Sequence, residues 1–257
     1  MTSTALKLLA LGLMLIDHIA EYIPGIPIWF HWLGRLSAPL FIFCMAWGLS
    51  YTHDRKKYLI RLYCFGAIMA VLDLTCNNIY QKPYCYITNN IFVTLLLIGV
   101  ITSLIELCKQ DRKKGIKYII VFCIYQLITT FLCIAAEVIL PGYGIINFIG
   151  AITANLVFCE GSFIFILLGI LIYFCKESKP KLFYVYSIFC VIYLILSAIN
   201  DFSVQSLLFE NYQWMMIASL PFMYIYNGQK GKGLKYLFYI FYPAHIIILF
   251  WAGNLFF

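Results

Sequence analysis

The stretch LGLMLIDHIAEYI, residues 11–23, places an aspartate beside a histidine near the end of the first apolar run of the chain. This run begins near residue 5, and about 20 predominantly apolar residues are enough for a helix to cross a bilayer. An ionisable side chain inside a membrane costs at least about 2.5–3.5 kcal/mol to insert. Asp17 and His18 are therefore candidates for a functional site, provided that the run spans a membrane.

Apolar residues dominate the whole chain. Of the 257 residues, 63% are hydrophobic and 11% are charged, and the mean hydropathy is +0.90. A soluble domain is roughly half apolar and about a quarter charged. No polar stretch is long enough to fold as a separate soluble domain. We therefore expect one integral-membrane domain over residues 1–257, surrounded by the lipid bilayer.

Several apolar runs have the length of a membrane-spanning helix, so we expect an all-α transmembrane bundle of about nine spans. They lie near residues 5–23, 36–52, 58–76, 89–107, 117–140, 158–175, 182–200, 213–227 and 236–255. The first run lacks a small-x-small cleavage site, so we expect it to remain as the first span. Residues 143–157 are expected to form a re-entrant or interfacial segment, although 143–175 has room for two short helices.

Basic residues are distributed unevenly between the two ends of these spans. With the N-terminus in the cytoplasm, sixteen of the 18 Lys and Arg residues fall on the cytoplasmic side, and only Arg35 and Lys82 fall outside. Cytoplasmic loops of membrane proteins concentrate positive charge in this way. We expect a multi-pass protein of the cell (inner, cytoplasmic) membrane. The net charge of +7 then reflects topology rather than a nucleic-acid partner.

The ten cysteines show neither a C-x-x-C pair nor the spacing of metal ligands, so no metal is expected. Most of them lie inside apolar runs, where a free cysteine acts as a small packing residue. Cys76 and Cys85 share one predicted outer loop, and a disulfide could join them there.

Only a few ionisable residues fall at membrane depth. They are Asp17, His18, Arg35, Arg61, Asp73, Glu137 and His245. Adjacent helical residues point about 100° apart, so Asp17 and His18 each need a partner from another helix. In one interpretation His18 is a general base supported by the carboxylate of Asp17 or Asp73. In the other, Asp17 is a structural clamp that pairs with Arg35 or Arg61.

His245 and the basic loops each allow a functional and a structural interpretation. Pro243 frees a backbone carbonyl in the last helix, and His245 could bind substrate or satisfy that carbonyl. A cytoplasmic basic patch could hold phosphates or serve only as a topology signal. It consists of Arg55, Lys56, Lys57, Arg61, Arg112 and Lys113.

Seven motifs, in this order, resemble those of the TraX family. They are LKLLALGLMLIDHI, GRLSAPLFIFCMAWGLSYT, YLIRLYCFGAI, NNIFVTLLL, PGYG, YNGQKG and YLFYIFYPAHIIIL. The resemblance extends from about residue 5 to 255. It implies a membrane-embedded acetyltransferase similar to the broader integral-membrane acyltransferases, because the family's namesake acetylates the N-terminus of the conjugative F pilin. Ser37-Ala38 and residues 143–160 depart from the family pattern.

Residue by residue, the resemblance implies a catalytic pair and a substrate site. Asp17 and His18 fall on the family's Asp-His motif, which makes His18 the expected base. Arg35, Asn90, Tyr242 and His245 fall on further motifs and are expected, together with Asp73, to contact substrate. Arg61 falls on the Tyr-Leu-x-Arg-Leu motif and is expected, with the rest of the basic patch, to bind acetyl-CoA.

The expected reaction moves acetyl from cytoplasmic acetyl-CoA to an amine or hydroxyl on the outer side of the membrane. The acceptor is expected to be a pilin-like N-terminus or another component of the cell envelope. Two alternatives stay open. The chain could be a small proton-coupled transporter or flippase in which Asp17, Asp73, Glu137 and His18 form a relay. It could also be a structural assembly factor whose buried polar groups only join helices.

Overall fold

The computed structural model describes residues 1–257 except 81–84, 141, 143, 200 and 257. Lys82 and Tyr143, which entered the predictions, lie outside the described residues. The described chain is helical, and seven of its helical segments are long and apolar enough to cross a membrane. They are α1 (Ser3–Tyr22), α2 (Trp29–Gly34) taken with α3 (Ser37–Tyr51), α4 (Arg55–Ile79), α5 (Ile91–Gln110), α6 (Arg112–Ile139), α9 (Lys179–Ala198) and α11 (Lys235–Phe256). The predicted all-α multi-pass fold is confirmed.

The predicted count of about nine spans is approximate, because two of the runs form shorter pieces. Residues 158–175 contain α8 (Ser162–Cys175), which has 14 residues. Residues 213–227 form no single α-helix but a 3-10 helix, η2 (Tyr212–Ser219), followed by α10 (Leu220–Tyr224). A π-helical turn, η1 (Ser206–Glu210), precedes them. The apolar pattern reveals the length of a run, but it does not distinguish these tighter and wider helices from α-helix.

The segment expected to be re-entrant or interfacial forms only one short helix, α7 (Ile145–Ile152). Its eight residues rise about 12 Å, far less than the roughly 30 Å of a bilayer core. Gly144 precedes α7 with a φ of 88°, a left-handed conformation that favours glycine. A spanning helix is therefore absent from the described part of 143–157.

Polar N-caps mark where three of the long helices begin. The side chain of Thr2 accepts a hydrogen bond from the backbone N–H of Ala5 at the start of α1. Asp54 accepts from Lys57 N–H before α4, and Asp111 accepts from Lys114 N–H before α6. Such caps satisfy backbone donors that have no partner in the first helical turn.

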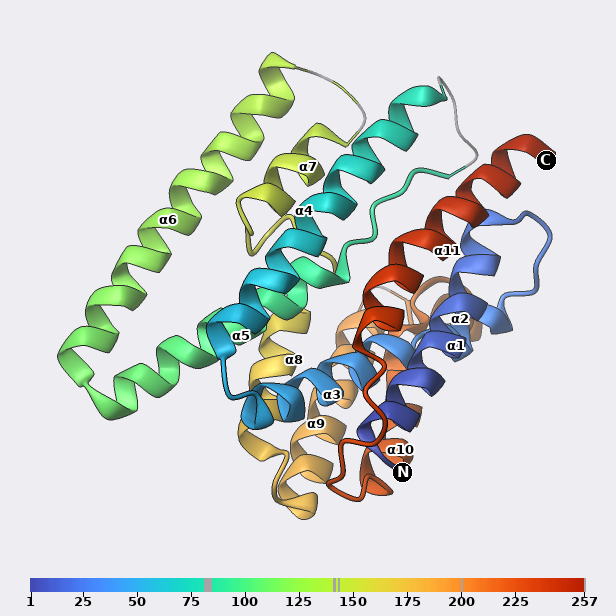
Figure 1. The fold of residues 1–257 in the computed structure, drawn as a ribbon. Coiled ribbons are helices and arrows are strands. Elements are labelled where there is room, and N and C mark those ends of the chain that lie inside the picture. Colours follow the sequence, from blue (N-terminus) through green and yellow to red (C-terminus); the bar gives the residue numbers. More distant parts are fainter. Residues whose placement is uncertain (81–84, 141, 143, 200, 257) are drawn as a thin grey trace. The chain divides into compact units, whose positions relative to one another are not determined.

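The chain forms two compact units, Met1–Trp47 with Leu171–Phe257, and Gly48–Ile170. In the second unit α5 and α6 form an antiparallel pair joined through Asp111 (Figure 1). Gly115 allows this close approach, because a Cβ there would lie 2.4 Å from the Cα of Cys108. Helix α7 packs against both α4 and α6.

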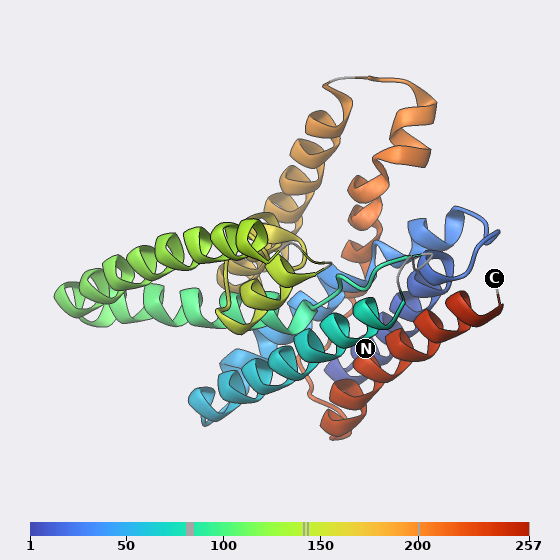
Figure 2. The ribbon, with the colours of Figure 1, turned by 90° about the horizontal axis from the view of Figure 1, so that it is seen from above.

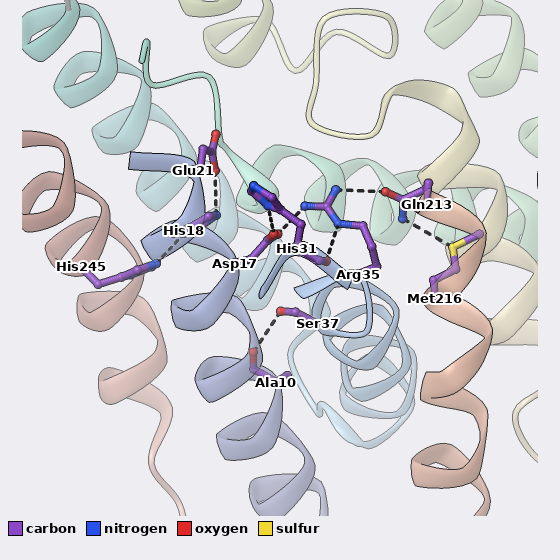
Figure 3. Close-up of polar contacts among 10 residues, drawn as sticks. All are labelled: Ala10, Asp17, His18, Glu21, His31, Arg35, Ser37, Gln213, Met216 and His245. Carbon is purple, nitrogen blue, oxygen red and sulfur yellow. Dashed lines mark hydrogen bonds and ion pairs between the residues drawn. The ribbon is translucent and has the colours of Figure 1, made fainter. Parts of the chain in front are cut away.

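The first unit packs α1 against α2 and α11, and α9 against η2. Figure 2 shows α9 and the segment of η2 and α10 as two antiparallel arms. The buried hydroxyl of Tyr186 on α9 donates to the carbonyl of Met216 and lies 2.8 Å from Ser219 Oγ. Ser37 at the start of α3 donates to the Ala10 carbonyl of α1, which joins these two helices (Figure 3).

All ten cysteines are free, so the disulfide considered between Cys76 and Cys85 is absent. No group of three or more His, Cys, Asp or Glu side chains suited to a metal ion occurs among the described residues.

Candidate functional site

Asp17 and His18 point toward different helices, although they are adjacent on α1 (Figure 3). His18 contacts His245 on α11, whereas Asp17 contacts His31 and Arg35 from α2 and its C-terminal end. All these residues belong to the first unit. Each member of the Asp-His motif therefore takes its partner from another helix, as the helical geometry requires.

The two buried histidines form a direct hydrogen bond. His18 Nδ1 lies 2.7 Å from His245 Nε2, and the rings are stacked with centroids 5.0 Å apart. His245 Nδ1 lies 2.7 Å from the carbonyl oxygen of Phe241, which can only accept. When His245 is neutral its proton is therefore on Nδ1, and Nε2 accepts the proton of His18 Nδ1. A neutral His18 consequently carries its lone pair on Nε2.

The choice of backbone partner by His245 is informative. Pro243 lacks an N–H, so the carbonyl it frees is that of Tyr239, four residues earlier. His245 bonds to Phe241 instead. The side-chain hydrogen bond of His245 therefore does not go to the carbonyl that Pro243 frees.

Glu21 provides a carboxylate one turn after His18. Its Oε2 lies 3.7 Å from His18 Nε2, and its side chain is about one-quarter exposed. This ion pair forms only when His18 is protonated. Glu21 and His245 thus lie at the two nitrogens of one ring.

Asp17 forms a partly buried charge pair with Arg35. Arg35 Nη2 donates to Asp17 Oδ2 at 2.5 Å, and His31 Nδ1 donates to Asp17 Oδ1 at 2.7 Å. Gly34 permits this packing, because a Cβ at that position would lie 2.2 Å from Asp17 Cγ. The pairing of Asp17 with Arg35, which the structural interpretation predicts, is thus present in the structure.

The guanidinium of Arg35 joins α2 to the 3-10 helix η2. Its Nη1 donates to Gln213 Oε1 at 3.2 Å, and its Nε donates to the His31 carbonyl at 3.3 Å. The ring of Tyr212 lies 5.5 Å from the guanidinium carbon. Burial raises the pKa of the Tyr212 phenol, while Arg35 opposes that shift, so the phenol stays neutral at ordinary pH. Three of the five N–H groups of Arg35 are engaged, which leaves two for a ligand.

Sequence reasoning missed three members of this cluster. His31 received no role, although it lies one helical turn before Arg35 and shares its face of α2. Glu21 follows His18 by three residues on α1, so these two side chains also share one face of their helix. These spacings were available as signals. Gln213 carried no such signal, because only the fold brings η2 to α2.

Tyr242 packs beside the histidine pair. Its ring centroid lies 5.9 Å from that of His245, and it is 3% exposed. Aromatic rings of Tyr22, Phe241 and Tyr242 surround the pair and exclude water from it. The structure thus brings Asp17, His18, Arg35, Tyr242 and His245 together in one unit.

Asp73 and Asn90, also expected at the substrate site, lie in the second unit. Both line a cavity of about 20 Å³ between α4, α5, α7 and the segment before α8. Asn90 is the N-cap residue of α5 and donates from Nδ2 to the Gly66 carbonyl. Their proximity to one another was not predicted.

The basic patch lies at the N-terminal ends of α4 and α6. Arg55 forms an ion pair with Glu106, and Lys57 lies 3.2 Å from Asp54. Lys56, Arg112 and Lys113 are exposed. The buried Nε of Arg61 has no hydrogen-bond partner among the described residues, and its guanidinium lies 5.9 Å from the Tyr58 ring.

Comparison with known proteins agrees with the motif resemblance. A curated relative from Dichelobacter nodosus, described as probable fimbrial assembly protein FimC of serogroup H1, is 25% identical over 259 residues. The alignment covers 95% of this chain and 92% of that protein. No solved structure matches this chain. The sequence model of the TraX protein family matches residues 2–252, and the chain therefore belongs to the TraX family.

Proposed function

We propose that this protein is a membrane-embedded acetyltransferase that uses acetyl-CoA as donor. The acceptor is an amine or hydroxyl on the outer side of the cytoplasmic membrane, with a pilin-like N-terminus as the first candidate. Family membership and the description of the relative as a probable fimbrial assembly protein support a link to pilin. In this proposal the N-terminus is cytoplasmic, as the distribution of basic residues predicts.

The hydrogen-bonded pair of His18 and His245 carries this proposal. A buried imidazole needs a fixed tautomer before it can act as a base, and the chain from the Phe241 carbonyl through His245 to His18 provides one. A pair that served only to join helices would not require a carboxylate near the second nitrogen of His18, yet Glu21 lies there.

The reaction is a direct transfer. His18 Nε2 removes a proton from the acceptor amine or hydroxyl as that group attacks the thioester carbonyl. The tetrahedral intermediate then collapses, the carbon–sulfur bond breaks, and His18 returns its proton to the CoA thiolate. The products are the acetylated acceptor and CoA, and no covalent enzyme intermediate is required.

Arg35 is the proposed donor to the developing oxyanion. Two of its N–H groups remain after its bonds to Asp17, Gln213 and the His31 carbonyl. Because those three partners hold the guanidinium in place, little reorganisation accompanies charge development. His245 is a positioning residue in this scheme, since both of its ring nitrogens are engaged. Asp17 likewise positions Arg35 and His31.

The phosphates of acetyl-CoA are assigned to the basic patch. The Nε of Arg61 has no hydrogen-bond partner among the described residues, and Lys56, Arg112 and Lys113 are exposed. Arg55 and Lys57 already pair with Glu106 and Asp54, so they are expected to contribute less.

The test combines acetyl-CoA binding with CoA release in the purified protein, using a peptide with a free N-terminus as surrogate acceptor. We expect His18→Ala to lower the rate of CoA release by about 10²–10⁴-fold without changing the Kd for acetyl-CoA. His245→Ala should lower it by at most about 10²-fold, since it disturbs the tautomer and leaves the base. Arg61→Ala should raise the Kd.

His53→Ala is the matched control, because His53 is exposed in the loop before α4 and has no proposed role. Its rate and Kd should equal those of the wild type. If the wild type fails to bind acetyl-CoA, the enzyme loses its donor and the proposal fails. If His18→Ala folds and keeps its full rate, the same geometry serves only as helix packing and the assembly-factor alternative replaces the enzyme.

The transporter alternative is less well supported. Both carboxylate oxygens of Asp17 are engaged, by Arg35 and His31, so Asp17 is not poised to exchange a proton. Uptake or lipid flipping without acetyl-CoA, abolished in Asp73→Asn, would favour that alternative.

A further inference from the structure

The loop that precedes α11 is tied to the first turn of α1, within the first unit (Figure 1). It contains the YNGQKG motif, which the proposed acetyl transfer does not use. The backbone N–H of Ser3 donates to the Gln229 carbonyl at 2.8 Å, and that of Thr4 donates to the Lys230 carbonyl at 3.1 Å. Thr4 Oγ1 also lies 2.9 Å from the Lys230 carbonyl oxygen and 2.6 Å from that of Lys232. These bonds hold the loop in one conformation at the predicted cytoplasmic end of α1.

Gly231 allows the loop to approach α1 this closely. Its φ is 77°, a left-handed conformation that favours glycine, and a Cβ there would lie 2.7 Å from Thr2 Oγ1. The backbone N–H groups of Lys230, Gly231 and Lys232 donate to no acceptor among the described residues. Successive N–H groups in such turns form concavities that bind anions. The loop therefore offers backbone donors as well as lysine side chains.

Lys7 places a further ammonium group beside this loop, one turn after Thr4 on α1. Its side chain is partly buried, and its Nζ lies 5.5 Å from the centroid of the Phe238 ring. The groups whose charge acts on Lys7 are Cys44 and Lys230, and no carboxylate is among them. Neither lysine forms an ion pair within the described part of the chain. Two neighbouring ammonium groups repel each other, so an anion bound between them would stabilise both.

We propose that Lys7 and the loop around Lys230 form a binding site for a phosphate group. Ammonium and backbone N–H groups are the donors that proteins use for phosphate oxygens. A loop that served only as a topology signal would need its charge, but not a fixed conformation. The site lies in the first unit, whereas the basic patch assigned above to acetyl-CoA lies in the second.

Two sources present phosphate at the cytoplasmic end of a membrane protein. One is the diphosphate of a nucleotide-containing acyl donor, and the other is the headgroup of an anionic phospholipid. Both offer the same oxygen acceptors to the lysines and the loop. The site therefore does not depend on the acetyl transfer proposed above, and its test measures binding without acyl transfer.

The test is a calorimetric titration of the full chain in neutral detergent at fixed ionic strength. The probes are inorganic pyrophosphate, CoA, and phosphatidylglycerol in mixed micelles, with phosphatidylcholine as the reference lipid. Lys230→Gln and Lys7→Met should each raise the Kd of the bound probe by about tenfold, because each removes a charged hydrogen-bond donor. The matched control is Lys181→Gln, which removes the same charge from an exposed position of the same unit and should leave the Kd unchanged.

A second pair of variants changes the loop without changing its charge. Gly231→Ala should also raise the Kd, because the new Cβ would collide with Thr2 and the left-handed φ would be strained. Gly233→Ala is its control, since a Cβ there would meet nothing within 4 Å, and it should bind as the wild type does. If Gly231→Ala does not fold, the exposed Lys230→Gln keeps the test decisive.

The pattern of weakened probes identifies the source of the phosphate. Weaker binding of pyrophosphate and CoA supports the proposal with a soluble donor, and weaker binding of phosphatidylglycerol alone supports it with a headgroup. The proposal is overturned if no probe binds the wild type. It is also overturned if Lys230→Gln, Lys7→Met or Gly231→Ala folds and keeps the wild-type Kd for every probe, or if Lys181→Gln weakens binding as much as Lys230→Gln does.

Discussion

Two partly buried aspartates in this protein have opposite surroundings. In the first unit Asp17 is neutralised by Arg35, and both of its oxygens accept hydrogen bonds. In the second unit Asp73 lines a cavity with Glu160, has one oxygen without a partner, and faces no cationic side chain that the structure describes. Among the described residues, the same residue type at membrane depth is fully hydrogen-bonded in one unit and only partly hydrogen-bonded in the other.

This difference shows that a buried charge is not in itself a functional signal. The membrane makes every such group costly, so each must be compensated. Compensation from within the chain produces a rigid scaffold, as Asp17 does for the residues around His18. Whether a charged side chain at membrane depth is structural therefore depends on which groups contact it, and not on the charge alone.

The largest predicted effect on stability comes from breaking the pair of Asp17 and Arg35. Arg35→Met leaves Asp17 buried without its cation, so the free energy of unfolding should fall by about 3 kcal/mol. We place the loss at the lower end of the usual range because both side chains are partly exposed, Arg35 by 26% and Asp17 by 13%. Unfolding in mixed micelles measures it.

The double variant Asp17→Asn with Arg35→Met should recover most of that loss, because both charges are removed together. Asp73→Asn, in contrast, should cost little, because no cationic side chain lies beside Asp73 among the described residues. A double variant as unstable as Arg35→Met would show that Arg35 stabilises the unit through its other contacts. A destabilised Asp73→Asn would erase the contrast between the two sites.

An intermediate effect is expected from packing at the same pair. Gly34→Ala places a Cβ where Asp17 Cγ lies, so we expect a loss of about 1–3 kcal/mol as the carboxylate is displaced. The matched control is Gly12→Ala on α1, where a Cβ would meet nothing within 4 Å. That control should be neutral or stabilising, because alanine favours helix. Thermal unfolding of both variants decides whether Gly34 is needed for the pair.

The smallest effect is expected at a carboxylate that water already solvates. The backbone N–H of Lys57 lowers the pKa of Asp54 below its ordinary value of 3.8. A carboxyl whose pKa is lower in the folded protein stabilises the folded state at every pH above its ordinary pKa. This stabilisation is lost as the pH falls through the lowered pKa of the folded protein. Asp54→Ala should therefore lower the Tm slightly near neutral pH. The difference from the wild type should vanish in acid, and a constant difference would argue against the cap.

Much of the fold could be predicted from the sequence, because the bilayer demands long apolar helices. The spans at 5–23, 58–76 and 89–107 correspond to α1, α4 and α5 within a few residues. The 213–227 span could not be predicted as 3-10 helix, since hydropathy is similar for both helix types. The predicted single domain over 1–257 stays a prediction.

The sequence alone determined that Asp17 and His18 face different partners, because adjacent residues on a helix point about 100° apart. It also placed His245 as a polar group in an apolar helix. Only the tertiary structure decided which groups meet: His18 with His245, Asp17 with His31 and Arg35, and Asp73 with Asn90 at one cavity. The physical reason is that periodicity specifies the direction of a side chain on its own helix, whereas a contact depends on how whole helices pack.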